Sequence, residues 1–218
     1  MGLTAMIAVM LSAFFAVLTP LTANALYNNG QFAKVNPYKP PPPHPGNFPA
    51  ALSAGKFLIA SRTLKDPRFA QTVILILDYG QGGATGVIIN RPTNIKLSDA
   101  LPHAAEFHGL SYTVYIGGPV MPNGMTALIR SSEQIHGAAR VFGDVHVSPS
   151  LDAIKGIIGK NTRTLRFFAG YAGWGPRQLD GEVARGGWHV LPADAETVFT
   201  MSPAEVWSRL MLILNATN

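Results

Sequence analysis

The stretch Gly170–Leu179 (GYAGWGPRQL) holds the most distinctive chemical groups of this 218-residue sequence. Its two aromatic residues, Tyr171 and Trp174, are set among three glycines, and Pro176 marks the expected start of a helix. Backbone N–H groups at a helix start attract anions, and Arg177 stands beside them. The two rings are suited to wall a pocket, but aromatic residues at a strand–helix corner mostly pack in the core. The stretch therefore predicts either a small anion site or a tight structural corner, and the corner is the commoner outcome.

The other patterns of reactive side chains do not form a recognised site. The sequence has no cysteine, which excludes disulfides, thiolate zinc sites and cysteine nucleophiles. His103, Glu106 and His108 do not converge on one face of a regular helix, so no metal site is predicted. Gly80–Gly86 (GQGGATG) lacks the spacing of nucleotide-binding loops and separates two apolar runs, which favours a hairpin turn. No cofactor is expected, and the sequence favours a protein that binds over one that catalyses.

Four basic residues gather near the middle of the chain and are candidates for contact with phosphate groups. They are Lys155, Lys160, Arg163 and Arg166. No aromatic residues alternate with them, and runs of charge usually form a solvated surface. The net charge of +5 is also too diffuse to indicate nucleic acid. We therefore expect a solvated face here.

Composition sets the first 25 residues apart from the rest. The first charged side chain is that of Lys34, and Ala5–Leu18 is an apolar run of 14 residues. A membrane-spanning helix needs about 20 residues, so the run is typical of a signal-peptide core. Ala23–Ala25 (ANA) has small residues at the two positions that a signal peptidase reads. We predict a signal peptide over 1–25 and a periplasmic or secreted protein. The alternatives are a membrane anchor through residues 5–18, or a cytoplasmic protein if the segment is not a leader.

Residues 26–54 and 55–218 differ in their proline and glycine content. Seven prolines lie between Pro37 and Pro49, which predicts a disordered, extended linker. Residues 55–218 hold 19 of the 22 glycines and match a single domain in size. Many glycines in a folded domain indicate tight turns and close backbone approaches. We expect a sheet-rich domain here.

Hydrophobic periodicity predicts strands and helices mixed without a strict alternation, which indicates an α+β domain. A capping box at Ser202–Glu205 begins the last helix, whose apolar face should be core. The other expected helices are Leu97–Phe107, Ser148–Ile158 and Pro176–Ala184. The expected strands are Lys56–Ser61, Thr72–Leu77, Gly86–Asn90, Thr113–Ile116, Met125–Ser131, Ala139–Val147, Leu165–Ala169 and Trp188–Leu191.

Several of these stretches, taken in order, resemble the YqgE/AlgH family from about Gly55 to Phe199. GYAGWG with the following Gln-Leu is the most specific of them. The others are GKFLIA (55–60), DPRF (66–69), GVIINRP (86–92), GGPV (117–120) and the turn around residues 148–152. The resemblance implies a single compact domain built on a coiled, branching, mostly antiparallel sheet flanked by helices.

The resemblance supplies no activity. One branch of the family is linked to transcriptional control, but an exported protein would not meet DNA. We therefore expect a non-enzymatic binding or regulatory protein with a protein or small-anion partner. The alternatives are a hydrolase or transferase acting on an anionic substrate, or a transcription-linked regulator. The positions that match the family's motifs give five candidate binding residues, which are Asn90, Arg91, Tyr171, Trp174 and Gln178. Arg177 stands where the family usually has a small residue, and we add it as a sixth candidate because its charge lies beside the expected helix start.

Overall fold

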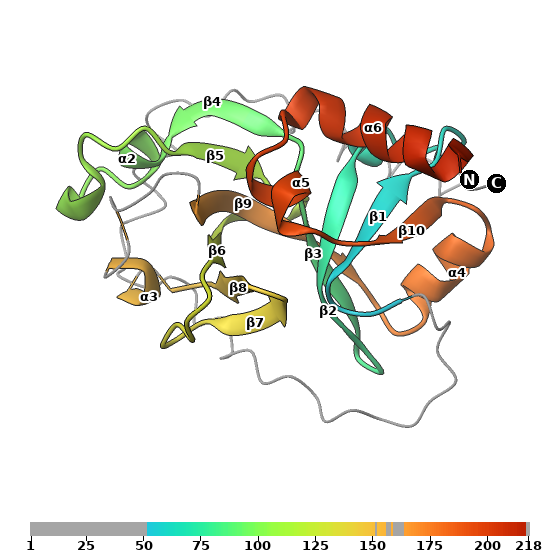
Figure 1. Ribbon diagram of the computed structural model, residues 1–218, viewed down its shortest axis with the longest axis horizontal. Coiled ribbons are helices and arrows are strands. Elements are labelled where there is room, and N and C mark those ends of the chain that lie inside the picture. Colours follow the sequence, from blue (N-terminus) through green and yellow to red (C-terminus); the bar gives the residue numbers. More distant parts are fainter. Residues whose placement is uncertain (1–51, 151, 156–157, 159–163, 217–218) are drawn as a thin grey trace, which may run out of the picture.

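The computed structural model describes residues 52–150, 152–155, 158 and 164–216 (Figure 1). The predicted signal segment and nearly all of the proline-rich stretch lie outside these residues, as do Lys160 and Arg163. Within the described part of the chain, none of the helices combines the length and the apolar character needed to cross a bilayer.

The described residues form one sheet of ten strands with short helices around it. Eight strands follow the order β10-β1-β2-β3-β9-β6-β8-β7, and β4 and β5 branch from β9. All pairs are antiparallel except β5 with β9. The strands are β1 (Lys56–Ala60), β2 (Val73–Gly80), β3 (Gly83–Ile88), β4 (Pro92–Lys96), β5 (Thr113–Ile116), β6 (Val120–Arg130), β7 (Ala139–Phe142), β8 (Val145–Ser148), β9 (Leu165–Trp174) and β10 (Trp188–Pro192).

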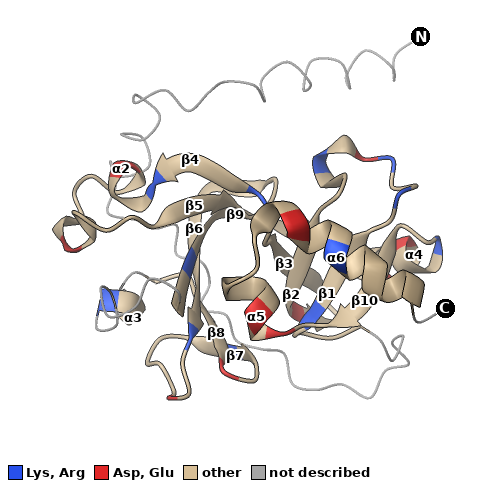
Figure 2. Cartoon of the chain, turned by 45° about the horizontal axis from the view of Figure 1, so that its top comes forward, with Lys and Arg blue, Asp and Glu red and all other residues tan. Residues whose placement is uncertain are grey.

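The helices are distributed around the two ends of the sheet. In Figure 1, α6 and α4 lie at the β1–β10 end, and α2 and α3 lie at the opposite end. Charged residues lie mostly in helices and connecting segments, which leaves the strands largely uncharged (Figure 2). The helices are α2 (Leu97–Ala100), α3 (Asp152–Lys155), α4 (Gln178–Ala184), α5 (Ala195–Phe199) and α6 (Pro203–Ala216), with 3-10 turns η1 (Pro67–Phe69) and η2 (Ala105–Phe107).

Strand β9 is the branch point of the sheet because it pairs with three other strands. Its first half lies between β5, which is parallel, and β6, which is antiparallel. Its second half pairs with β3, with Gly86 opposite Ala172 and Ala84 opposite Trp174. Val120 of β6 also faces Tyr171 there. The two halves of the sheet are therefore joined through one ten-residue strand.

Glycine is required where the strands separate. Gly170 has a φ of +70°, and a Cβ atom there would press on the backbone of residues 118–122. A Cβ atom on Gly117 or Gly118 would overlap the backbone of Gly170 or Tyr171. The N–H of Gly117 donates to the carbonyl of Ala169, and its own carbonyl accepts from the N–H of Ile88. The GGPV and GYAGWG motifs therefore meet in the fold as the two sides of the branch.

Alternation along β9 distributes its side chains among three apolar clusters. Phe167 and Phe168 enter different clusters, but Phe168 and Tyr171 share one, because the left-handed Gly170 shifts the alternation. Trp174 enters the third. We call these the α6 cluster (including Phe57, Val73, Phe168, Val198 and Leu210), the α2 cluster (including Leu97, Phe107, Ile129, Leu165 and Phe167) and the α4 cluster (including Leu58, Ile74, Trp174, Leu179 and Trp188).

The structure agrees with most of the expected elements and corrects three. The expected helix Leu97–Phe107 is wrong: helix α2 ends at Ala100, and η2 is a separate turn, since Pro102 interrupts the segment. Ser148 ends β8 and does not cap a helix; its hydroxyl binds the carbonyl of Gly137. The region 139–147 is a hairpin of two strands. Strand β4 and helix α5 were not expected.

Candidate functional site

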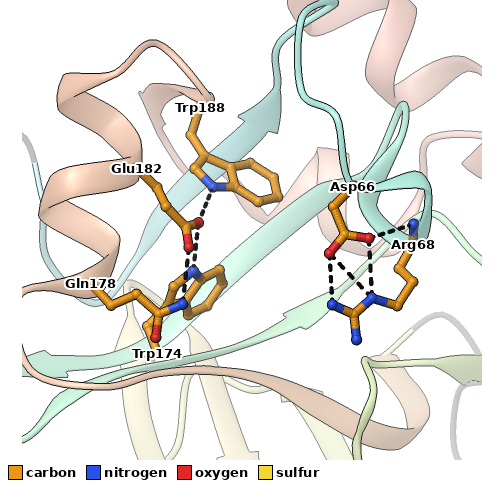
Figure 3. Close-up of polar contacts among 6 residues, drawn as sticks. All are labelled: Asp66, Arg68, Trp174, Gln178, Glu182 and Trp188. Atoms are coloured by element: carbon orange, nitrogen blue, oxygen red, sulfur yellow. Dashed lines mark hydrogen bonds and ion pairs between the residues drawn. The ribbon is translucent and has the colours of Figure 1, made fainter. Parts of the chain in front are cut away.

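A single carboxylate, that of Glu182 on α4, holds the corner between β9 and α4. Its Oε2 accepts hydrogen bonds from the indole Nε1 of Trp174 at 3.0 Å and of Trp188 at 2.9 Å (Figure 3). Its Oε1 accepts from Nε2 of Gln178 at 3.0 Å. The two indole rings meet edge to face with their centroids 6.2 Å apart. Both tryptophans are buried, and an indole has only this one donor, so Glu182 satisfies both.

The turn that leads into α4 satisfies its own backbone groups. The N–H of Gly175 donates to Oε1 of Gln178 at 3.1 Å, and the N–H of Gln178 donates to the carbonyl of Gly175 at 3.1 Å. Arg177 precedes the helix with a φ of 60°, and its side chain is exposed. Asp180 places an acidic group in the first turn. These contacts are those of a structural corner.

The two aromatic side chains of GYAGWG do not face a common space. Tyr171 is half-buried against the α6 cluster, and Trp174 belongs to the α4 cluster. A different aromatic residue, Tyr79 on β2, reaches α4: its hydroxyl donates to Oδ1 of Asp180 at 2.8 Å. Burial, and then the bond to Asp180, raise the pKa of Tyr79 well above its ordinary value. The phenol is therefore a fixed hydrogen-bond donor.

Asn90 and Arg91 form a second polar corner, where β3 leads into β4. Oδ1 of Asn90 accepts from the N–H of Val73 at 2.9 Å, and Nδ2 donates to the carbonyl of Gln71 at 2.9 Å. Gln71 has a φ of 55°, which is unusual for a residue with a side chain. The guanidinium of Arg91 donates to the carbonyl of Ala70 at 3.1 Å. The two side chains thus hold the segment just before β2.

Arg166 on β9 reaches the same corner from the other side of the branch. Its guanidinium donates to the carbonyl of Ile89 at 3.3 Å and lies 4.9 Å from the ring centre of Tyr115. Tyr115 pairs with Pro92, and the N–H of the next residue, Ile116, donates to the carbonyl of Arg91. Arg91 and Arg166 therefore flank the junction of β3, β4 and β5.

Neither of these two arginines has an acidic partner in the described part of the chain. Burial lowers the pKa of both guanidinium groups. The ordinary value lies so far above neutrality that both stay charged. Half-buried charges are normally paired, because removing them from water is costly. Among the described residues, each of the two cations thus has one backbone carbonyl as hydrogen-bond acceptor, and Arg166 has the ring of Tyr115 in addition.

The loop before β2 has a further basic residue, but that one is neutralised. Asp66 accepts hydrogen bonds from the backbone N–H and the guanidinium of Arg68, and the ion pair measures 2.7 Å (Figure 3). The bonds to Arg68 lower the pKa of Asp66. Arg68 also lies 5.8 Å from the ring centre of Phe69. The charge of Arg68 is therefore neutralised within its own turn, whereas Arg91 and Arg166 have no acidic partner among the described residues.

The comparisons with known proteins agree with this architecture. The model of the AlgH-like family matches residues 57–217. The chain belongs to the AlgH-like family. It is 36% identical over 162 residues to a UPF0301 protein of Streptomyces avermitilis, covering 72% of this chain and 84% of that protein. It is 35% identical over 181 residues to a UPF0301 protein of Mycobacteroides abscessus, covering 80% and 83%.

Two solved structures share the fold. The solution structure of AlgH from Pseudomonas aeruginosa matches with a TM-score of 0.62 and 32% identity, covering 74% of this chain and 88% of that chain. A crystal structure of a Corynebacterium diphtheriae protein matches with a TM-score of 0.62 and 22% identity, covering 81% and 90%. At that identity, the second supports the fold alone.

In this AlgH-like domain, five of the six candidate residues divide between two corners. Trp174, Arg177 and Gln178 belong to the β9–α4 corner, and Asn90 and Arg91 belong to the β3–β4 corner, whereas Tyr171 packs against the α6 cluster. The sequence did not single out Arg166, which was grouped with the solvated basic cluster. The available signal was its position between Leu165 and Phe167, both buried, on a strand whose neighbours are apolar. Among the described residues no group of three potential metal ligands forms.

Proposed function

We propose that this AlgH-like domain is a binding and regulatory protein, and that Arg91 and Arg166 receive an anionic group, a carboxylate or a phosphate. The observation that carries the proposal is Arg166. Its guanidinium is half-buried against Tyr115, and its one hydrogen bond to the described residues goes to the carbonyl of Ile89. Guanidinium groups have five N–H donors in a planar fork that matches such anions.

Two further features support a ligand at this corner. Arg91, also half-buried and likewise without an acidic partner in the described chain, is held by the carbonyl of Ala70. Asn90 fixes the backbone beside it through two hydrogen bonds, which gives the corner a preformed shape. Folding has already removed these two charges partly from water, so an anion that binds would gain their attraction without that desolvation cost. We propose binding without catalysis, since the corner supplies fixed donors and no nucleophile.

Thermal unfolding of the full chain tests the anion site. Inorganic phosphate, a nucleoside triphosphate, citrate and acetate are added one at a time to the wild type and to Arg166→Met, Arg91→Met and Arg177→Met. We expect at least one anion to raise the Tm of the wild type, since a ligand that binds only the native state stabilises it. We also expect this rise to disappear in Arg166→Met and Arg91→Met.

Arg177→Met is the matched control, because it removes an exposed arginine from the other corner. It should keep the rise. No rise in the wild type with any anion would eliminate the proposal. A rise that is lost only in Arg177→Met would move the site to the β9–α4 corner, and an equal rise in all four proteins would mean non-specific binding.

We also propose that the protein is exported, with residues 1–25 as its signal peptide. The support is the 14-residue apolar run before the first charge and the Ala-Asn-Ala sequence that follows it. N-terminal sequencing of the protein purified from cell fractions tests this. A mature chain beginning at Leu26 outside the cytoplasm is expected. Full-length protein in the cytosol would contradict export and would make contact with nucleic acid feasible.

A further inference from the structure

His146 on β8 is fully buried, and neither nitrogen of its ring makes a hydrogen bond of good geometry to a described residue, although the backbone of Asp144 is near enough to raise its pKa. More than nine in ten buried polar groups in proteins have a hydrogen-bond partner. Burying this ring without one therefore reduces the free energy of unfolding. A neutral imidazole bears burial far better than an imidazolium, whose charge must leave water. The site is therefore suited only to the uncharged ring.

The surroundings of the ring are apolar on the side that faces the protein. His146 is in register with Ile129 of β6, a member of the α2 cluster. Its neighbour Val145 points to the opposite face and joins the α6 cluster. The ring of His146 thus lies on the α2-cluster face of the sheet, beside a side chain that offers no hydrogen bond.

Segment 131–138, which joins β6 to β7, covers this face. Ile135 and Ala138 pack against the α2 cluster. The carbonyl of Gly137 accepts a hydrogen bond at 2.9 Å from the hydroxyl of Ser148, two residues beyond His146 on the same face. Displacement of this segment, or of the strand that follows it, would open the surroundings of the ring to water.

The strand that follows, β7, is short and lies at the end of the sheet. It has four residues, and its register with β8 shifts between Arg140 and Phe142. Within the described sheet it pairs with β8 alone. Edge strands with few hydrogen bonds open at low free-energy cost. The cover of His146 therefore includes an edge of the sheet that can open at low free-energy cost.

The charged groups near the ring come from β7, the β7–β8 turn, β6 and the covering segment. Arg140 of β7 is the cross-strand partner of His146, and Asp144 lies in the β7–β8 turn. Arg130 of β6 holds the Asp144 carboxylate in an ion pair of 2.8 Å. Burial and then Arg140 lower the pKa of His146, and the backbone and carboxylate of Asp144 act in the opposite direction. Glu133 and His136 of the covering segment are exposed.

We propose that His146 is a pH-sensitive latch, whose protonation on acidification releases edge strand β7 together with segment 131–138. In the closed form the ring is neutral. In the open form it is hydrated and titrates near its ordinary value of about 6.5. Opening therefore becomes more favourable as the pH falls below that value, and the open-to-closed ratio rises about tenfold per pH unit until the closed form also titrates. The released surface includes apolar side chains that would then be free to bind a partner.

Hydrogen exchange of the full chain, followed by mass spectrometry between pH 7.5 and 5.0, tests the latch. Rates are corrected for the intrinsic pH dependence of exchange. In the wild type we expect exchange over 131–148 to accelerate about tenfold per unit below pH 6.5, while β1 and β2 stay protected. His146→Phe, which keeps an aromatic ring but cannot be protonated, should lose the acceleration.

The matched control is His136→Gln, which removes an exposed histidine from the covering segment and should keep the acceleration. An equal acceleration in wild type and His146→Phe would overturn the latch. Its loss in His136→Gln would overturn it too, because it would assign the effect to the other histidine. If His146→Phe does not fold, NMR titration of the wild-type ring decides. Titration below pH 6.5 together with opening of 131–148 supports the latch, and titration near 6.5 in a closed hairpin refutes it.

Discussion

The backbones of Gly118 and Tyr171 are in direct contact, so that a Cβ atom on Gly118 would overlap the carbonyl group of Tyr171. This contact joins the GGPV motif to the GYAGWG motif at the branch of the sheet. The neighbouring Gly117 is confined by the backbone of Gly170, and Gly170 is confined by the backbone of Gly118 and Val120. The motifs of this sequence therefore have a common structural cause, which is the close crossing of two chain segments at β9.

Replacing Gly118 by alanine should destabilise the domain. The added methyl group meets backbone on the facing strand, which cannot rotate away, and overpacking of this kind costs about 3 kcal/mol of unfolding free energy. Urea denaturation followed by fluorescence measures the loss. Gly82→Ala is the control, because a Cβ atom there meets nothing within 4 Å, and it should change the free energy by less than about 0.5 kcal/mol. Equal stability of the two variants would mean that the branch can widen.

Removing the carboxylate of Glu182 should be costly, because it leaves two buried indole donors without an acceptor. We expect Glu182→Ala to lose about 3 kcal/mol and Glu182→Gln about 1 kcal/mol, since glutamine keeps one oxygen that faces the indoles. Urea denaturation gives both values, and tryptophan fluorescence reports the change around Trp174 and Trp188. The precision of such a measurement is about 0.5 kcal/mol. A smaller loss in the alanine variant would show that water replaces the carboxylate as the acceptor of the two indole N–H groups.

Asn90 should contribute to stability through the N–H of Val73. Asn90→Ala leaves that buried donor unpaired and releases the carbonyl of Gln71, for a loss of about 2 kcal/mol. Asn94→Ala removes an exposed amide from the neighbouring strand and should have little effect. Amide exchange at Val73 provides a direct measurement. Unchanged protection of that amide in Asn90→Ala would contradict a structural role for the side chain.

The raised pKa of Tyr79 predicts a loss of stability in alkali. Burial and the bond to Asp180 keep the phenol protonated in the folded chain, while the unfolded chain ionises near pH 10. The unfolded state therefore releases its proton first, and stability falls as the pH rises above that value. Thermal melts at pH 9 and pH 11 should show a larger decrease in Tm for the wild type than for Tyr79→Phe. Equal decreases would exclude Tyr79 as the cause.

The sequence predicted the elements that carry a strong local signal. The apolar runs of β1, β2 and β3 and the face of α6 that buries Val206, Leu210 and Met211 are explicit in residue spacing. Strand β4 (PTNIK) has no such signal: its residues alternate between exposed and half-buried. Helix α5 has only five residues, too few for a periodic pattern. Tertiary contacts, and not local preference, determine these two elements.

The candidate sites were less predictable, because their key groups interact across long distances in sequence. In the sequence Glu182 is an ordinary acidic residue of an expected helix, and nothing in its neighbourhood points to Trp188 across the turn. Arg166 belongs to a run of basic residues, and only the pairing of β9 with β5 brings it over Tyr115. His146 is surrounded by ordinary strand residues. Its lack of hydrogen-bond partners is a property of the three-dimensional arrangement alone.

The pairing of the first strand of the sheet with the last has a consequence for when the domain can fold. Lys56–Ala60 pairs along one edge with Trp188–Pro192, and the strand that joins the two halves of the sheet spans residues 165–174. A chain that leaves the ribosome from its N-terminus therefore lacks these partners until most of it has been made. Contacts so distant in sequence also form slowly. The domain should therefore remain unfolded until its synthesis is nearly complete.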